Sequence, residues 1–165
     1  TDLSGAAIEL VTQEDREYYL KNALEPLKPI YDYILIDCPP SLGILTLNGL
    51  AAADSVLVPM QCEFFALEGI TLLLQTIQKV QAQINPDLKI GGIFFTMYDS
   101  RTRRAHDVVL QVKSYFKDVV FNTIIPRNIR LSEAPSNGLP ICKYDPECAG
   151  AKSYEKLAEE VMRRG

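Results

Sequence analysis

Short, nearly continuous apolar runs alternate along this chain with longer segments whose apolar residues recur at helical spacing. Unbroken apolarity is typical of strands buried on both faces of a parallel sheet. The predicted strands lie at residues 33–36, 55–59, 90–97, 119–125 and near 141. The predicted helices lie at residues 12–27, 42–53, 67–84, 104–116 and 151–164, and a long loop is expected at 126–138. This alternation predicts an α/β fold with a mostly parallel sheet and helices on both faces.

Length and composition agree with one domain that has a full core. The chain has 165 residues, of which 47% are hydrophobic, so we expect a single α/β domain over residues 1–165. No uninterrupted apolar run reaches the roughly 18 residues of a membrane span, so no membrane association is expected. The four cysteines include no C-x-x-C pair, which argues against a zinc finger or a redox motif and favours a reduced, cytoplasmic protein.

Asp37 directly follows the apolar run at residues 33–36. Ligands in such sheets bind at the carboxyl ends of the strands, and a carboxylate there resembles a Walker B acid that orients the water around a nucleotide-bound Mg²⁺. Pro39 and Pro40 stiffen the turn that follows, as would suit a switch that senses the terminal phosphate. The alternative is that Asp37 only caps this turn. A phosphate-binding loop would decide between them, but the sequence contains no G-x-x-x-x-G-K-[ST] motif.

Charge is segregated along the sequence. The net charge is −4, yet residues 96–130 hold seven Lys or Arg and three Asp, a local charge of +4. A basic segment of this kind can bind nucleic-acid phosphates, but it can equally be the solvated start of a helix. The only histidine, His106, has no cysteine or carboxylate cluster at metal spacing and is expected to be a solvated helix residue.

The segment at 151–164 argues against a membrane-binding helix. Its apolar face is accompanied by Glu155, Glu159 and Glu160, whereas a helix that lies on a membrane carries a Lys- and Arg-rich polar face. We therefore expect this helix to pack on the domain.

Four ordered motifs resemble those of the ParA/Soj chromosome- and plasmid-partitioning ATPases. They are YDYILIDCPPSLG at 31–43, VPMQCEFFALEG at 58–69, IPRNIRLSEAPS at 125–136 and YDP at 144–146. The resemblance covers nearly the whole chain. It implies a P-loop NTPase fold with a deviant Walker A loop. It places this chain in the C-terminal two thirds or so of such a protein, as an N-terminally truncated portion that lacks the loop.

The resemblance also assigns site residues. Asp37 matches the acid associated with Mg²⁺ through water and is the expected catalytic residue, while Pro39 matches switch II. The adenine pocket is expected at two strand ends, at Thr96, Met97, Pro126, Arg127 and Asn128. Without the resemblance, Pro126 would simply end a strand and Asn128 would make a turn.

The implied function is DNA segregation driven by ATP and Mg²⁺. In the family, ATP closes a homodimer that binds DNA without sequence preference, and a ParB-type partner stimulates hydrolysis. Arg101 and Arg130 match the arginines that hold DNA, and Arg103 and Arg104 are expected to join them. The expected localisation is cytoplasmic and nucleoid-associated.

Because the Walker A motif is absent from the sequence, we expect this chain by itself neither to bind ATP tightly nor to hydrolyse it. In the family the phosphate-loop strand lies beside the strand at 33–36. Without it we expect shifted strands or an element swap between two copies. Two alternatives to a partitioning ATPase stay open: a MinD-like membrane-associated regulator of division, and a non-enzymatic interaction module.

Overall fold

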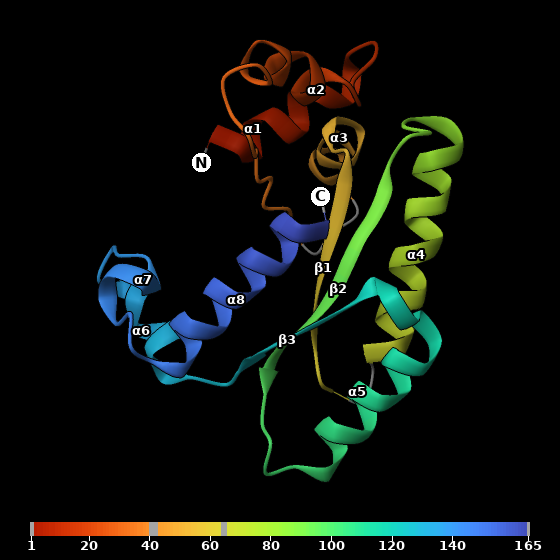
Figure 1. Ribbon diagram of the computed structural model, residues 1–165. Coiled ribbons are helices and arrows are strands. Elements are labelled where there is room, and N and C mark those ends of the chain that lie inside the picture. Colours follow the sequence, from red (N-terminus) through yellow and green to blue (C-terminus); the bar gives the residue numbers. More distant parts are fainter. Residues whose placement is uncertain (1, 40–42, 64–65, 165) are drawn as a thin grey trace. The chain divides into compact units, whose positions relative to one another are not determined.

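Among the residues that it describes, the computed structural model has three strands in one sheet, in the order β1-β2-β3 (Figure 1). They are β1 (Ser55–Gln61), β2 (Lys89–Tyr98) and β3 (Val120–Pro126), which confirms the predicted strands at 55–59, 90–97 and 119–125. β2 and β3 pair in parallel, with Ile93 opposite Val120 and Tyr98 opposite Pro126. The structure describes residues 2–39, 43–63 and 66–164.

The chain divides into two compact units. Unit 1 comprises Thr1–Val56 and Leu72–Lys89, and unit 2 comprises Leu57–Thr71 and Ile90–Gly165. Each unit is described by itself below. The expectation that residues 1–165 form a single domain stays a prediction.

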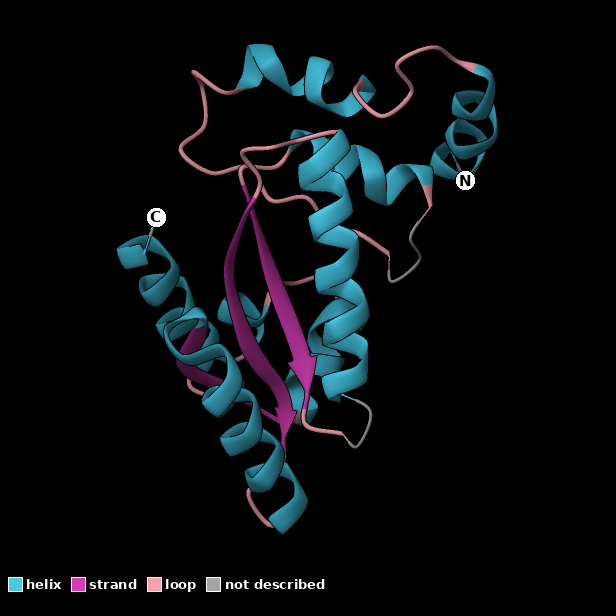
Figure 2. Cartoon of the chain, turned by 90° about the vertical axis from the view of Figure 1, so that its right-hand side faces the viewer, coloured by secondary structure: helices cyan, strands magenta, loops and turns pink. Residues whose placement is uncertain are grey.

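Helices cover the sheet of unit 2, as predicted for an α/β fold. α8 (Ala149–Arg164) lies along the strands and α5 (Arg103–Phe116) lies on the other side of them (Figure 1), and Figure 2 shows helices in cyan running beside the magenta strands. The core between α8 and the sheet is formed by Phe121, Ile125 and Leu157, all at most 6% exposed. Phe121 meets Phe94 edge-on, with ring centroids 6.3 Å apart, and the Arg164 guanidinium lies 4.1 Å from the centroid of the Phe121 ring.

The segment after β3 differs from the prediction. The expected loop at 126–138 contains α6 (Ile129–Ser136), and the expected strand near residue 141 is the short helix α7 (Ile141–Tyr144). Asn128 caps α6, because its side-chain oxygen accepts a hydrogen bond from the Arg130 amide at 2.8 Å. Pro135 stands in the last turn of α6, so this proline does not prevent the helix from starting.

Unit 1 is helical. Its helices are α1 (Asp2–Glu9), the 3₁₀ turn Leu10–Thr12, α2 (Tyr19–Leu24), the 3₁₀ turn Glu25–Leu27 and α3 (Ile44–Ala52). The long helix α4 (Ala66–Gln83) contributes most of its length, as predicted. Buried Asn48 ties α3 to the α2 segment, because its side chain accepts from the Leu20 amide at 3.0 Å and donates to the Arg16 carbonyl at 2.7 Å.

The single helix predicted over 12–27 is wrong. Residues 13–18 form turns and bends, and Asp15 has a φ of 52°. Thr12 caps no helix there, since its hydroxyl donates to the Glu9 carbonyl at 3.3 Å. Apolar spacing predicts which residues can share a helix face, but it does not show that the backbone between them stays helical.

The predicted strand at 33–36 is also wrong. Residues 33–39 belong to no strand or helix, and Leu35 is 87% exposed. A parallel strand depends on neighbouring strands for its hydrogen bonds and its burial, and no described strand pairs with this segment. Ile36 and Cys38 instead lie against α3, where they approach Gly49.

Candidate functional site

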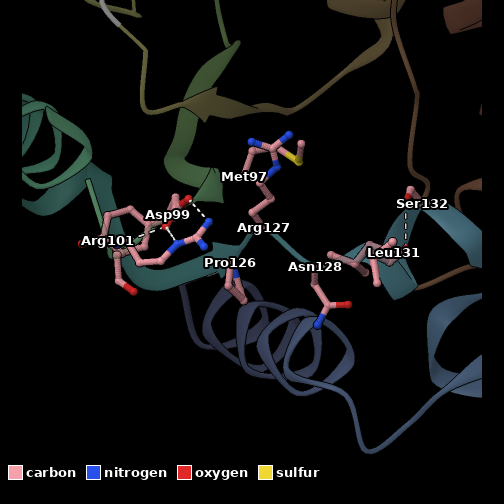
Figure 3. Close-up of a pocket in the computed structure, with 11 residues that line it drawn as sticks. Met97, Asp99, Arg101, Pro126, Arg127, Asn128, Leu131 and Ser132 are labelled. Atoms are coloured by element: carbon pink, nitrogen blue, oxygen red, sulfur yellow. Dashed lines mark hydrogen bonds and ion pairs between the residues drawn. The ribbon is translucent and has the colours of Figure 1, made fainter. Parts of the chain in front are cut away.

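A pocket of about 840 Å³ lies where β2 and β3 end in unit 2 (Figure 3). Four of the five residues predicted for an adenine pocket line it, namely Met97, Pro126, Arg127 and Asn128. The fifth, Thr96, is half-buried in β2 and is not among the lining residues. The pocket therefore stands at the carboxyl ends of two parallel strands, the position at which α/β sheets bind ligands.

Parallel pairing brings the two segments together. Tyr98 and Pro126 are opposite one another in the register, and the Arg127 amide donates a hydrogen bond to the Tyr98 carbonyl at 2.9 Å. The next residue, Asn128, turns the chain into α6. The first turn of α6 thus adds Ile129, Leu131 and Ser132 to the wall of the pocket.

Met97 adopts an uncommon backbone conformation at the pocket. Its φ is 53°, in the left-handed region that residues with a side chain seldom occupy. The side chain is 48% exposed and lines the pocket rather than the core. Strained backbone of this kind clusters at functional sites.

Asp99 and Arg101 form an ion pair on the pocket wall. The guanidinium donates from Nε to Oδ1 at 2.9 Å and from Nη2 to Oδ2 at 2.7 Å, as the dashed lines in Figure 3 show. Oδ1 also accepts from the Arg101 amide at 3.1 Å. The hydrogen bonds from Arg101 lower the pKa of the Asp99 carboxyl, so Asp99 is ionised at neutral pH.

Arg130, the second arginine predicted to hold DNA, is also paired with carboxylates. Its Nη1 lies 2.9 Å from Glu133 Oε2 and its Nε lies 3.4 Å from Asp145 Oδ2. The Tyr144 hydroxyl donates to the same oxygen of Glu133 at 3.2 Å. The pairing with Glu133 raises the pKa of Arg130, which keeps its full positive charge.

Arg103 and Arg104 are exposed in the first turn of α5. They form no ion pair or side-chain hydrogen bond within the described ranges. Thr102 caps this helix, since its hydroxyl oxygen accepts from the Ala105 amide at 3.4 Å. The four arginines predicted to hold DNA thus all lie in unit 2, on α5, on α6 and in the turn between β2 and α5.

Asp37 and Pro39 belong to unit 1 and are exposed in the segment that precedes α3. The Pro39 carbonyl lies 3.5 Å from the Thr46 hydroxyl. The remaining switch residues of the prediction, Pro40, Ser41 and Leu42, lie outside the described residues.

No group of three or more His, Cys, Asp or Glu side chains in the described part of the chain could hold a metal ion alone. Mg²⁺ in nucleotide sites is commonly held by one or two carboxylates, phosphates and water, so a single exposed Asp37 fits a water-mediated role. No helix among residues 2–39, 43–63 and 66–164 is both long and apolar enough to cross a bilayer.

Sequence reasoning misses part of the pocket. Because a loop is expected at 126–138, the prediction does not place Ile129, Leu131 and Ser132 on a helix beside the pocket. Asp99 is counted only as one of the three acidic residues of the basic segment. The cap signal of Asn128 before Ile129 is the pattern that indicates α6. Asp99 stands two residues before Arg101, and only Tyr98 separates it from the predicted strand at 90–97; this position is the available signal for the ion pair.

The lining suits a flat, partly polar ring. Met97, Pro126, Ile129 and Leu131 supply apolar surface, while Asn128, Ser132 and the backbone at the strand ends supply hydrogen-bonding groups. A ligand pocket typically combines such an apolar wall with a few polar groups that fix orientation. A purine base fits this chemistry.

Comparison with protein families and curated proteins gives a consistent result. The model of an AAA domain family matches residues 1–90. The chain is 68% identical over 163 residues to the chromosome-partitioning ATPase Soj of Treponema pallidum, covering 99% of this chain and 64% of that protein. It is 58% identical over 163 residues to the chromosome partitioning protein ParA of Myxococcus xanthus, covering 99% of this chain and 58% of that protein.

Solved structures share the fold. Cobyrinic acid a,c-diamide synthase from Mycobacterium smegmatis, crystallised with ADP and magnesium, has a TM-score of 0.80 and 42% identity over 98% of this chain and 59% of that chain. The cell division ATPase MinD of Pyrococcus furiosus has a TM-score of 0.71 and 27% identity over 90% of this chain and 59% of that chain.

This chain therefore spans about three fifths of the length of the curated relatives it matches. The matches cover nearly all of its own length, and the α/β fold agrees with that of the solved neighbours. The chain belongs to the AAA domain family, and nearly all of its length is similar to the Soj and ParA chromosome-partitioning proteins.

Proposed function

We propose that the intact protein, meaning a protein of its relatives' length that contains this chain, is an ATPase that segregates DNA. It binds ATP with Mg²⁺, dimerises, binds DNA without sequence preference and is stimulated by a ParB-type partner. It works in the cytoplasm, in association with the nucleoid. The observation that carries this proposal is the pocket at the ends of β2 and β3, lined by four of the five residues that the family resemblance assigns to adenine.

In this proposal the pocket receives the base. Pro126 and Met97 cover the ring, and Asn128 and the backbone at the strand ends form hydrogen bonds to its edge. Support comes from the solved neighbour from Mycobacterium smegmatis, which was crystallised with ADP and magnesium and also with an ATP analogue and magnesium.

Asp37 acts on the phosphate side. Its carboxylate orients water bound to Mg²⁺, and Pro39 belongs to the switch that senses the terminal phosphate. Phosphoryl transfer in such sites depends on positioning and electrostatic stabilisation, so neither residue forms a covalent intermediate. The Walker A motif is not in this sequence, so we expect the 165-residue chain alone to show no ATP turnover.

DNA binding is assigned to Arg101, Arg103, Arg104 and Arg130. The side chain of Arg101 is 85% exposed and that of Arg130 is 51% exposed, so both guanidinium groups can reach a phosphate. A dimer doubles this basic surface, and phosphate contacts of this type give affinity that falls steeply with salt.

The nucleotide part is tested by equilibrium binding of a fluorescent ATP analogue with Mg²⁺ to the intact protein. Pro126→Ala should weaken binding, because it removes apolar surface from the base. The matched control is Pro146→Ala, an exposed proline of the YDP motif that does not line the pocket. Equal affinity of both variants and the wild type would contradict the assignment of the pocket.

The DNA part is tested by titrating a labelled duplex of random sequence with the ATP-bound intact protein at two salt concentrations. Arg101→Ala and Arg130→Ala should each weaken binding. The slope of log affinity against log salt should become shallower by about one for each phosphate that the variant no longer neutralises. Unchanged affinity in both variants would remove these arginines from the DNA surface.

The MinD-like alternative has weaker support. Identity to the solved MinD is 27%, against 68% to the Soj protein of Treponema pallidum. The middle of α8 carries Glu155, Glu159 and Glu160, whereas a helix lying on anionic lipid would be basic. Co-sedimentation of the intact protein with liposomes in ATP separates the two: we expect no binding.

A further inference from the structure

We infer that Asp99 limits the affinity of the protein for DNA by holding the Arg101 guanidinium in competition with DNA phosphate. This inference rests on the proposed function, since it concerns the surface there assigned to DNA. It assigns a role to an acidic residue that lies inside the basic segment.

The geometry of the pair explains the competition. Arg101 donates from Nε and Nη2 to the two carboxylate oxygens of Asp99, at 2.9 and 2.7 Å (Figure 3). A guanidinium binds a phosphate through the same fork of two parallel N–H groups. While Asp99 occupies this edge of Arg101, a phosphate cannot use it.

Asp99 is the fixed member of the pair. Its carbonyl accepts hydrogen bonds from the Thr102 amide at 3.1 Å and the Thr102 hydroxyl at 3.0 Å. Its Oδ1 accepts from the Arg101 amide at 3.1 Å, and its side chain is only 22% exposed. Arg101 is 85% exposed, so the guanidinium can leave Asp99 without any change in the fold.

Charge on the carboxylate supports the same conclusion. Hydrogen bonds from Arg101 lower the pKa of Asp99, and the positive charge of Arg127 contributes to this effect. Asp99 is therefore fully ionised at the pH of any binding assay, and it cancels one positive charge beside the proposed phosphate contact.

The test compares Asp99→Asn with Asp107→Asn. Both changes remove one negative charge from the basic segment and keep the side-chain shape. Asp107 is exposed on α5 and forms no ion pair among the residues that the structure describes, so it controls for the general change in charge. In the Asp99→Asn variant the new amide retains an oxygen that can accept from the Arg101 backbone N–H, which preserves the turn.

Both variants are tested as the intact ATP-bound protein on a labelled duplex of random sequence. We expect Asp99→Asn to bind this duplex more tightly than Asp107→Asn, by about two- to fivefold for each copy of the chain. Its salt dependence should be steeper by roughly one unit per copy, because one more phosphate contact forms. In an Arg101→Ala background the difference between the two substitutions should vanish.

Equal affinities of Asp99→Asn and Asp107→Asn would overturn the inference. Weaker binding by Asp99→Asn would also overturn it, because Asp99 would then orient Arg101 toward DNA. If the wild type and every variant fail to bind DNA while ATP still binds, the DNA part of the proposed function fails, and the inference fails with it. The melting temperatures of all variants show whether a loss of DNA binding comes from unfolding of the variant.

Discussion

Glu160 on α8 holds Thr123 on β3 by two hydrogen bonds to one carboxylate oxygen. The Thr123 amide and hydroxyl donate to Oε2 at 2.9 and 2.8 Å, and the Asn122 amide donates to Oε1 at 2.8 Å. These residues lie where the pairing of β2 and β3 is irregular, between the register positions of Val120 and Ile124. A side chain from α8 thus satisfies backbone groups at this irregular part of the strand.

Replacement of Glu160 by Ala should destabilise the protein by about 3 kcal/mol. The side chain is only 9% exposed, and its removal leaves the partly buried donors of Asn122 and Thr123 without their acceptor and takes away the carboxylate partner of Arg164. Urea unfolding followed by circular dichroism measures the change. Glu159→Ala, at the exposed neighbouring position, is the control and should change stability by less than about 0.5 kcal/mol.

Stability should also depend on the ionisation of Glu160. Burial alone would raise its pKa, but hydrogen bonds from Asn122 and Thr123 and the charge of Arg164 outweigh burial, and the net pKa is lowered from its usual 4.5. A lowered pKa in the folded state stabilises the protein above pH 4.5 and loses this effect as the pH falls through the lowered value.

The free energy of unfolding should therefore differ most between wild type and Glu160→Gln above pH 4.5, and the difference should shrink below it. Subtracting the variant's curve of unfolding free energy against pH from that of the wild type removes the contribution of the other carboxylates. A difference that stays constant down to acid pH would contradict this role of the charge.

Gly92 should not tolerate a side chain. A Cβ at this position in β2 would overlap the ring of Phe121, which belongs to the core beneath α8. Gly92→Ala should cost about 1–3 kcal/mol by forcing the ring or the strand to move. Gly69→Ala is the matched control, since its Cβ meets nothing within 4 Å in α4 and should stabilise the helix. Thermal melts of equal midpoint for the two variants would disprove the crowding at Gly92.

Asn128 has a structural role that can be separated from its proposed role at the base. Asn128→Ala removes the cap of α6 and should cost about 1 kcal/mol. Asn128→Asp should retain stability, because it keeps the side-chain oxygen that accepts from the Arg130 amide. It lacks the NH₂ group that could donate to the base. If the amide donates to the base, Asn128→Asp weakens nucleotide binding in the intact protein. Wild-type affinity in this variant would limit Asn128 to capping.

The helices and strands that the sequence predicts correctly are those whose apolar pattern lies within the segment itself. β1, β2, β3, α4, α5 and α8 each combine an apolar periodicity with a clear beginning or end. Four pocket residues follow from the family resemblance, because the ends of neighbouring parallel strands meet at one edge of the sheet.

Where prediction fails, the structure depends on neighbours rather than on local pattern. The run at 33–36 is apolar enough for a buried strand, but no described strand pairs with it, and Leu35 remains exposed. α6 escapes prediction because Pro126, Pro135 and Gly138 indicate a loop, although Pro135 falls only in the last turn. The Asp99–Arg101 pair depends on side-chain geometry in a turn, which no periodicity reveals.

The most direct test of the central claim is photolabelling of the intact protein with 2-azido-ATP and Mg²⁺, followed by identification of the labelled peptides. We expect label in the segments at 97–101 and 126–132, which line the pocket, and disappearance of that label when unmodified ATP competes. Label confined to other segments, or label that ATP does not displace, would show that the pocket at the ends of β2 and β3 is not the site of the base.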